Sequence, residues 1–97
     1  MTNQIIIVAA LSVKPECKQE VLQFLKGLIE KSREEAGNIQ YNLHQSTTDA
    51  NKLTFIEIWE SQKAVDTHGQ TPHFKAFEAF IKDKVDALSI ELMQKII

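Results

Sequence analysis

The residues of this chain best suited to moving protons are three histidines and one glutamate: His44, His68, His73 and Glu57. Histidine changes its charge near neutral pH, so each of the three rings could act as a general base. Glu57 shares one face of a predicted strand with Phe55 and Trp59. Burial among these aromatic rings would raise the pKa of Glu57 toward neutrality. These four side chains are therefore candidate proton carriers.

Each candidate also has an ordinary structural interpretation. His68 lies near the end of a predicted short helix, where its ring could contact the helix-terminal carbonyl groups. His73 is predicted to be the second residue of the next helix, either as an exposed polar group or beside N–H groups that bind an oxyanion. His44 could be a surface or dimer-contact residue, and Glu57 could pair with a cation or backbone donors across a dimer.

Two other chemistries are less favoured by the spacing of the residues. The histidines and Glu57 could supply imidazole and carboxylate ligands to a metal ion. However, no two of them show helical i, i+4 spacing, and His68 and His73 are separated by a proline, so we expect no metal site. Cys17 is predicted in the first turn of a helix, where the dipole could activate a thiol, but its apolar helix face favours a packed thiol.

Composition bounds the class of protein. The chain has 97 residues, 43% of them apolar, and a net charge of −2, which predicts one folded domain over residues 1–97. The sequence contains no basic tract of the kind that binds nucleic acid, so we expect no nucleic-acid partner. The longest apolar run, Ile5 to Leu11, is too short to cross a membrane. It is not preceded by the basic residues that are typical of a secretory signal. With a single cysteine as well, these absences favour a cytoplasmic protein without a membrane partner.

Hydrophobic periodicity predicts seven elements along the chain. Apolar runs and alternation predict strands, and 3.6-residue spacing predicts helices. Strands are expected at residues 5–13, 38–47, 52–60 and 87–97, and helices at residues 15–36, 62–69 and from 72 onward. The first strand is apolar throughout and is expected to be covered on both faces.

Boundary residues support this division. Pro15 and Pro72 suit first helical positions, where a missing N–H costs nothing. Ser61 and Thr71 are expected to cap the second and third helices. Gly37 is expected at the position that follows the first helix, where a left-handed conformation is common.

The element order β-α-β-β-α-β is typical of ferredoxin-like α+β domains, with helices on one face of an antiparallel sheet. The other face would have no helix to cover it, and an exposed apolar sheet face is rare in soluble monomers. We therefore expect a homodimer formed sheet to sheet, with Phe55 placed in the interface.

Half of the chain also resembles a known superfamily, and the rest agrees with it by element order. The resemblance is to the antibiotic biosynthesis monooxygenase superfamily, in particular its small bacterial quinol-monooxygenase-like members. It is carried by Ser32-Arg33-Glu34-Glu35-Ala36-Gly37, Tyr41-x-Leu43, Phe55-x-Glu57-x-Trp59-Glu60-Ser61, Ala64, Asp66-x-His68 and Thr71-Pro72-His73-Phe74. Members are dimeric α+β barrels, which agrees with the uncovered face.

The resemblance implies oxidation of a small aromatic hydroquinone or phenol by O2 without a cofactor. Such a reaction needs a base, a dry pocket and donors for a developing oxyanion. His68 matches a histidine that recurs in the superfamily and is our first candidate for the base, followed by Glu57 and His44. The candidate substrate-binding residues are His73, Trp59, Tyr41 and Phe74, of which Trp59 is also a core candidate.

The superfamily implies other activities as well. Haem-degrading members use an asparagine, a tryptophan and a histidine, where this chain has Ala9, His68 and Glu78, so haem degradation is disfavoured. The sequence contains no glycine-rich loop of the kind that binds the phosphates of a dinucleotide, and we expect no cofactor. The segment from Ser32 to Asn38 resembles a branch that isomerises a phosphorylated sugar. An isomerase of a small phosphorylated carbonyl compound, using His44 or Glu57, and a non-catalytic binding dimer are therefore the alternatives.

Overall fold

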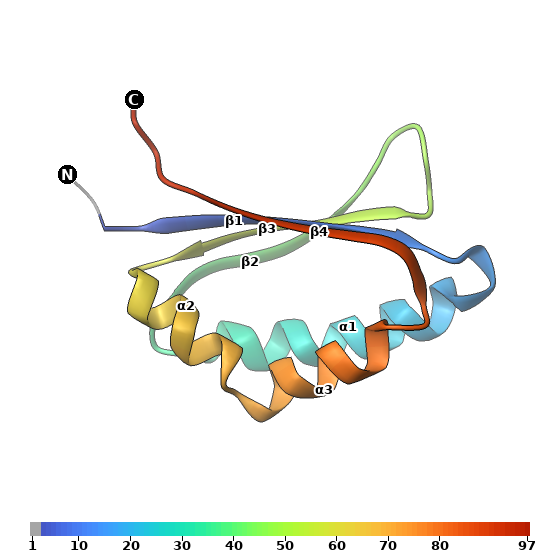
Figure 1. Cartoon of the computed structure of the whole chain (residues 1–97), viewed down its shortest axis with the longest axis horizontal. Coiled ribbons are helices and arrows are strands. Elements are labelled where there is room, and N and C mark those ends of the chain that lie inside the picture. The colour runs from blue at the N-terminus through green and yellow to red at the C-terminus, as the bar shows by residue number, and fades with distance from the viewer. Residues whose placement is uncertain (1–2) are drawn as a thin grey trace.

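A computed structural model describes residues 3–97 of the chain. A four-stranded antiparallel sheet forms one layer, and the helices form a second layer against one of its faces (Figure 1). The elements are β1 (Ile5–Val13), a short 3₁₀ turn (Pro15–Cys17), α1 (Lys18–Arg33), β2 (Asn38–Gln45), β3 (Lys52–Trp59), α2 (Gln62–Gly69), α3 (Pro72–Ile81) and β4 (Val85–Met93). Among these residues, no helix is both long and apolar enough to span a membrane.

The strand order is β2-β3-β1-β4, and each neighbouring pair is antiparallel. This is the ferredoxin-like α+β arrangement that the element order predicts. Below the sheet, α1 and α3 lie side by side, and the rings of Phe24 and Phe80 stack between them with centroids 4.1 Å apart. The short helix α2 continues from β3 and turns into α3 (Figure 1).

The two faces of the sheet differ sharply in burial. In β1, side chains alternate strictly between buried and half-buried, and the buried ones face the helices. In β3 the buried side chains are Leu53, Phe55, Glu57 and Trp59. Phe55 is only 2% exposed and contacts the ring of Tyr41 on the helix side, so its expected place in a sheet-to-sheet interface is wrong. Alternation groups residues on one face of a strand but does not say which face meets the helices.

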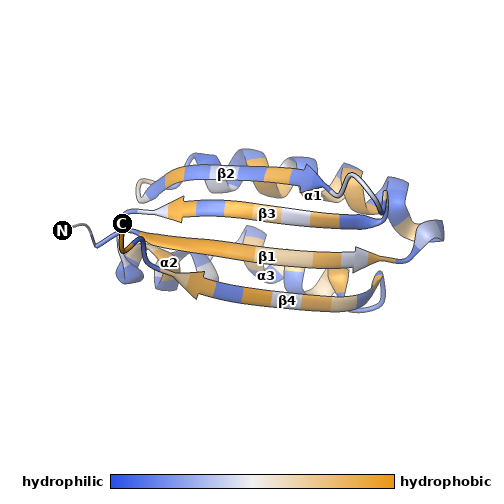
Figure 2. Ribbon diagram, turned by 90° about the horizontal axis from the view of Figure 1, so that it is seen from above, coloured by the Kyte–Doolittle hydropathy of each residue, from blue (hydrophilic) through white to orange (hydrophobic). Residues whose placement is uncertain are grey.

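Figure 2 looks onto the face that no helix covers, where the central strands are largely apolar. Ile6 and Val8 of β1 lie there beside Ile58 and Ile56 of β3, and all four are half-buried. The neighbouring strand β2 contributes polar side chains to the same face: Gln40, Asn42 and His44. The first strand is therefore covered by this chain on one face only.

Most element boundaries agree with the sequence, and the first helix and the last strand are the main exceptions. α1 spans Lys18–Arg33, three residues shorter at each end than the predicted helix, because Pro15–Cys17 form a 3₁₀ turn and the chain turns after Arg33. β4 begins at Val85, two residues earlier than expected, because Val85 pairs with Val13 after a register shift between β1 and β4. It ends at Met93, the partner of Ile6, because β1 begins at Ile5 and offers little further ladder. The second strand likewise ends at Gln45, before the turn.

Gly37 is needed for close packing rather than for a left-handed turn. The first helix ends at Arg33, and no described glycine has a positive φ. A Cβ atom at Gly37 would overlap the Cβ atom of Ala64 in α2. The carbonyl of Gly37 also accepts a hydrogen bond from the N–H of Glu60 at 2.9 Å. Gly37 therefore lets the segment after α1 approach α2.

Candidate active site

A cavity of about 150 Å³ lies between the helices and the sheet. Its walls are almost entirely apolar, and Glu57 and Tyr41 are the two lining side chains that carry polar groups. The other lining residues are Ile7, Ala9, Phe55, Val65, Gly69, Phe74, Phe77, Leu88, Ile90 and Leu92. An engineered apolar cavity of this volume binds benzene, so the space can hold one aromatic ring. It opens to solvent along β4, where Leu88, Ile90 and Leu92 are exposed.

Glu57 places a carboxyl group in this apolar wall. The residue is 4% exposed, and its Oε1 accepts a hydrogen bond from the indole N–H of Trp59 at 2.9 Å. Burial raises the pKa of Glu57 to about 7, against a smaller lowering by the Trp59 hydrogen bond. A carboxyl group of this kind exchanges its proton near neutral pH.

His68 lies beside the cavity, in α2, and is 4% exposed. Its ring is packed between Trp59, with centroids 4.5 Å apart, and Phe74, with centroids 4.9 Å apart. Tyr41 and Phe74 both contact the His68 ring and line the cavity. Gly69, which follows His68 in the chain, also lines the cavity. His68 does not line the cavity itself, but its ring contacts two of the side chains that do.

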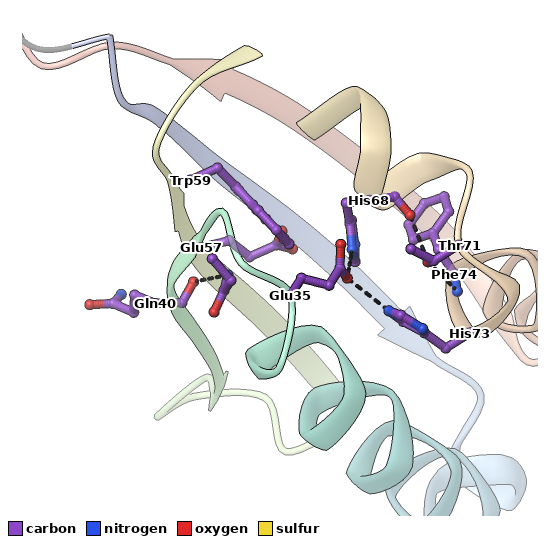
Figure 3. A network of polar contacts seen from close by, with 9 residues as sticks. Glu35, Gln40, Glu57, Trp59, His68, Thr71, His73 and Phe74 are labelled. Atoms are coloured by element: carbon purple, nitrogen blue, oxygen red, sulfur yellow. Dashed lines mark hydrogen bonds and ion pairs between the residues drawn. The ribbon is translucent and has the colours of Figure 1, made fainter. Parts of the chain in front are cut away.

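The two nitrogens of His68 have different surroundings (Figure 3). Nδ1 lies 2.6 Å from Oε2 of Glu35, whereas the buried Nε2 has no hydrogen-bond partner among residues 3–97. An ionised carboxylate only accepts hydrogen bonds, so Nδ1 carries the proton and Nε2 holds a lone pair. Burial lowers the pKa of His68, which favours the same neutral ring. This is the carboxylate–imidazole arrangement that prepares a histidine to accept a proton at Nε2.

The corner between α2 and α3 holds the His68 ring in place. Ser61 caps α2 by accepting a hydrogen bond from the N–H of Ala64 at 3.1 Å, as predicted. Thr71 caps α3 by accepting a hydrogen bond from the N–H of Phe74 at 3.2 Å. The same Thr71 hydroxyl donates to the carbonyl of His68 at 2.7 Å. One side chain therefore fixes the end of α2 and the start of α3.

Glu35 is the residue of this site that the sequence analysis did not single out. It lies in the turn after α1, and its Oε2 also lies 2.7 Å from Nε2 of His73 in the first turn of α3 (Figure 3). One carboxylate oxygen thus contacts two histidines that follow it by 33 and 38 positions. The only sequence signal was its place in the segment that resembles the superfamily.

The remaining predicted residues separate into two groups. Tyr41 and Phe74 line the cavity with Glu57, and Trp59 is fully buried and contacts both Glu57 and His68. His44 lies on the uncovered face of the sheet, where its exposed ring contacts the carbonyl of Thr54 at 3.1 Å. The structure therefore does not bring His44 to the cavity.

Comparison with known proteins gives this arrangement a family. A sequence model described as antibiotic biosynthesis monooxygenase matches residues 4–79. The chain belongs to the antibiotic biosynthesis monooxygenase family. The match contains Glu35, Glu57, His68 and His73, so the whole polar cluster lies inside the region that this monooxygenase family shares.

Relatives of known sequence agree with this membership. A Bacillus subtilis protein named "Putative monooxygenase YcnE" is 35% identical over 83 residues, covering 86% of this chain and 87% of that protein. An uncharacterised Synechocystis protein, sll1783, is 37% identical over 75 residues, which cover 77% of this chain. This chain spans about half, 51%, of the length of the Synechocystis protein.

Solved structures show the same monooxygenase-family fold. A conserved protein from Methanosarcina mazei Go1 superposes with a TM-score of 0.94 at 31% identity, over 98% of this chain and 95% of that one. A crystal structure titled as an antibiotic biosynthesis monooxygenase gives a TM-score of 0.90 at 29% identity, over 95% of this chain and 98% of that one.

Proposed function

We propose that this protein is a cofactor-independent monooxygenase that oxidises a small aromatic hydroquinone or phenol with O2. The observation that carries the proposal is the His68 imidazole, whose proton is held at Nδ1 by Glu35 while the unpaired Nε2 is buried beside an apolar cavity. A nitrogen with a free lone pair can act as a general base and accept a proton from a bound substrate. The family membership supports an oxidoreductase, and the cavity supports an aromatic substrate.

In the proposed first step, Nε2 of His68 takes the proton of a substrate hydroxyl group. Because Nε2 is buried, the substrate must displace one of the side chains between it and the cavity, such as Phe74. The resulting imidazolium is stabilised by the Glu35 carboxylate at 2.6 Å. The bound substrate displaces water from the apolar walls, and an aromatic anion with fewer water contacts donates an electron more readily.

The anion then passes one electron to O2, and the resulting radical pair combines to form a carbon–oxygen bond. The peroxide takes the proton from His68. The O–O bond then breaks as the ring carbon loses its proton, and this proton combines with the departing hydroxide to form water. A phenol thereby becomes a quinone, or a hydroquinone becomes a hydroxyquinone, with one O2 consumed and one water formed. Glu57, with a pKa of about 7, can donate to or accept from a second substrate oxygen in the cavity.

The alternative of a phosphorylated carbonyl substrate has less support. The residues lining the cavity include no lysine or arginine among those that the structure describes. A phosphate dianion in an apolar cavity without a cation would be strongly destabilised. The non-catalytic alternative would leave the Glu35–His68 arrangement without a chemical role.

The experiment is oxygen consumption by the purified protein with a panel of one-ring and two-ring phenols and hydroquinones. We expect turnover with one-ring substrates, no added cofactor, and one O2 consumed for each quinone formed. Lys75→Ala, at an exposed position of α3, is the control variant and should consume oxygen as the native protein does. Absence of oxygen uptake across the panel, together with proton exchange into a carbonyl compound, would support the isomerase instead.

A further inference from the structure

Glu35, His68 and His73 bring three metal-ligand atoms together from three separate elements. Glu35 follows α1, His68 lies in α2 and His73 in α3. Oε2 of Glu35, Nδ1 of His68 and Nε2 of His73 all lie within 4.8 Å of one another, and Figure 3 shows the three side chains converging. Among residues 3–97 this is the one such group of His, Cys, Asp or Glu side chains.

The donor set matches the preference of one class of ion. Two imidazole nitrogens and one carboxylate oxygen suit divalent first-row transition metals such as Zn²⁺, Co²⁺ and Fe²⁺. Zinc binds such ligands at about 2.0–2.2 Å, which places neighbouring ligand atoms roughly 3.4 Å apart in a tetrahedron. The present contacts of 2.6 and 2.7 Å to Glu35 would therefore lengthen by less than an ångström.

The cluster is also within reach of solvent. The side chains of Glu35 and His73 are 14% and 15% exposed, whereas that of His68 is nearly buried. Glu35 further lines a surface groove together with Ser61 and Thr67. An ion could enter from this side and keep a water molecule as its fourth ligand, as zinc does in open sites.

We propose that Glu35, His68 and His73 form a binding site for a divalent transition-metal ion, Zn²⁺ being the first choice, and that the bound ion switches off His68 as a base. An ion on Nδ1 of His68 displaces the proton there, and the neutral ring then carries its proton on Nε2. Nε2 becomes a donor that cannot accept a substrate proton. The binding site stands independently, whereas the switch rests on the proposed function.

The binding test is titration of the native protein with Zn²⁺ by calorimetry and with Co²⁺ by visible absorption. We expect roughly one ion per chain and a tetrahedral Co²⁺ spectrum. Glu35→Gln and His73→Gln should each weaken binding at least about 10-fold. His44→Gln is the matched control, because His44 lies on the opposite face of the sheet, and it should bind as the native protein does.

Circular dichroism of each variant separates loss of ligand from loss of fold, and the more exposed His73 is the safer substitution. Native protein that binds Zn²⁺ no more tightly than a folded His73→Gln variant would overturn the site. Equal weakening in His44→Gln would also overturn it, because the ion would then be bound elsewhere.

The switch has a readout that does not need turnover. The ¹⁵N NMR resonance of His68 Nε2 should change from an unprotonated to a protonated nitrogen when Zn²⁺ is added. Oxygen consumption should fall with Zn²⁺ and recover with a chelator, and His73→Gln should need at least about 10-fold more Zn²⁺ for the same inhibition. An Nε2 that stays unprotonated in the metal complex would overturn the switch. No turnover before metal is added would instead count against the proposed function.

Discussion

The two faces of the sheet are built from adjacent residues but differ in what covers them. Facing the helices, Phe55, Glu57 and Trp59 are almost fully buried and surround a cavity and a polar cluster. One residue along, Ile56 and Ile58 lie half-buried on the face without helices. Both faces are apolar, so hydrophobicity alone does not distinguish a core from a docking surface. What distinguishes the covered face is that polar side chains, Glu57 and His68, are buried there among the apolar ones.

We expect a second copy of the chain to cover the apolar face. Figure 2 shows the apolar residues concentrated on the central strands of that face, with polar residues on β2 at its side. An apolar centre with a polar edge is typical of protein interfaces. Homodimerisation by sheet-to-sheet packing therefore remains our proposal, with Ile56 in the interface in place of Phe55.

The largest expected effect comes from placing the same charge on either side of β3. Phe55→Asp puts a carboxylate in the core and should cost more than about 4 kcal/mol, enough to unfold the chain. Ile56→Asp, one residue along, should leave the monomer folded but prevent association. Circular dichroism measures the first effect and sedimentation velocity the second.

A native protein that sediments as a monomer at micromolar concentration would contradict the interface. So would an Ile56→Asp variant that remains fully associated. Unfolding by Ile56→Asp comparable to that by Phe55→Asp would show instead that both faces belong to one core.

The next effect isolates the chemistry on the covered face. His68→Ala should lower kcat/KM for the proposed oxidation about 10²- to 10⁴-fold, the usual range for the loss of a general base. Glu35→Gln keeps the shape of the orienting side chain but removes its charge, and it should cost activity by a smaller factor. Steady-state oxygen uptake measures both. Full turnover by folded His68→Ala would move the base to Glu57, which lines the cavity directly.

Much of this architecture could be predicted from the sequence, because its signals are local. Pro15, Ser61 and Thr71 mark helix starts through their own backbone chemistry, and alternation identifies β3. The side of β3 that meets the helices could not be predicted, because Phe55 and Ile56 are both apolar. Glu35 was missed because its partners follow it by 33 and 38 positions, and only the tertiary fold brings them together.

A third prediction concerns the pH dependence that Glu57 gives to the covered face. The folded chain holds the Glu57 proton up to about pH 7, whereas an unfolded chain releases it near the ordinary value of 4.5. The native state therefore binds more protons between these values, and stability falls as pH rises from about 4.5 to 7. The shift corresponds to about 3 kcal/mol.

Glu57→Gln replaces the carboxyl group with an amide of similar shape that does not titrate. It should remove this fall in stability with rising pH. The measurement is urea unfolding of native and variant protein at several pH values. The difference between the two curves cancels the other titrating groups, including His68, whose lowered pKa acts in the opposite direction below its ordinary value. A difference that stays constant from pH 4.5 to 7 would show that Glu57 titrates normally.

The smallest expected effect tests how α2, which carries His68, is held against the chain after α1. A methyl group at Gly37 would overlap that of Ala64, so Gly37→Ala should destabilise the fold by about 1–3 kcal/mol. Gly69 provides the matched control, because a Cβ atom there meets no other atom within 4 Å. Removing the opposing methyl in the double variant Gly37→Ala/Ala64→Gly should restore part of the loss, beyond the cost of a glycine within a helix. Chemical denaturation of the four members of this cycle measures the coupling between the two positions. Additive effects would mean that Gly37 matters only through its backbone. Coupling would instead show that the close contact between Gly37 and Ala64 helps to hold α2, which carries His68, against the chain after α1.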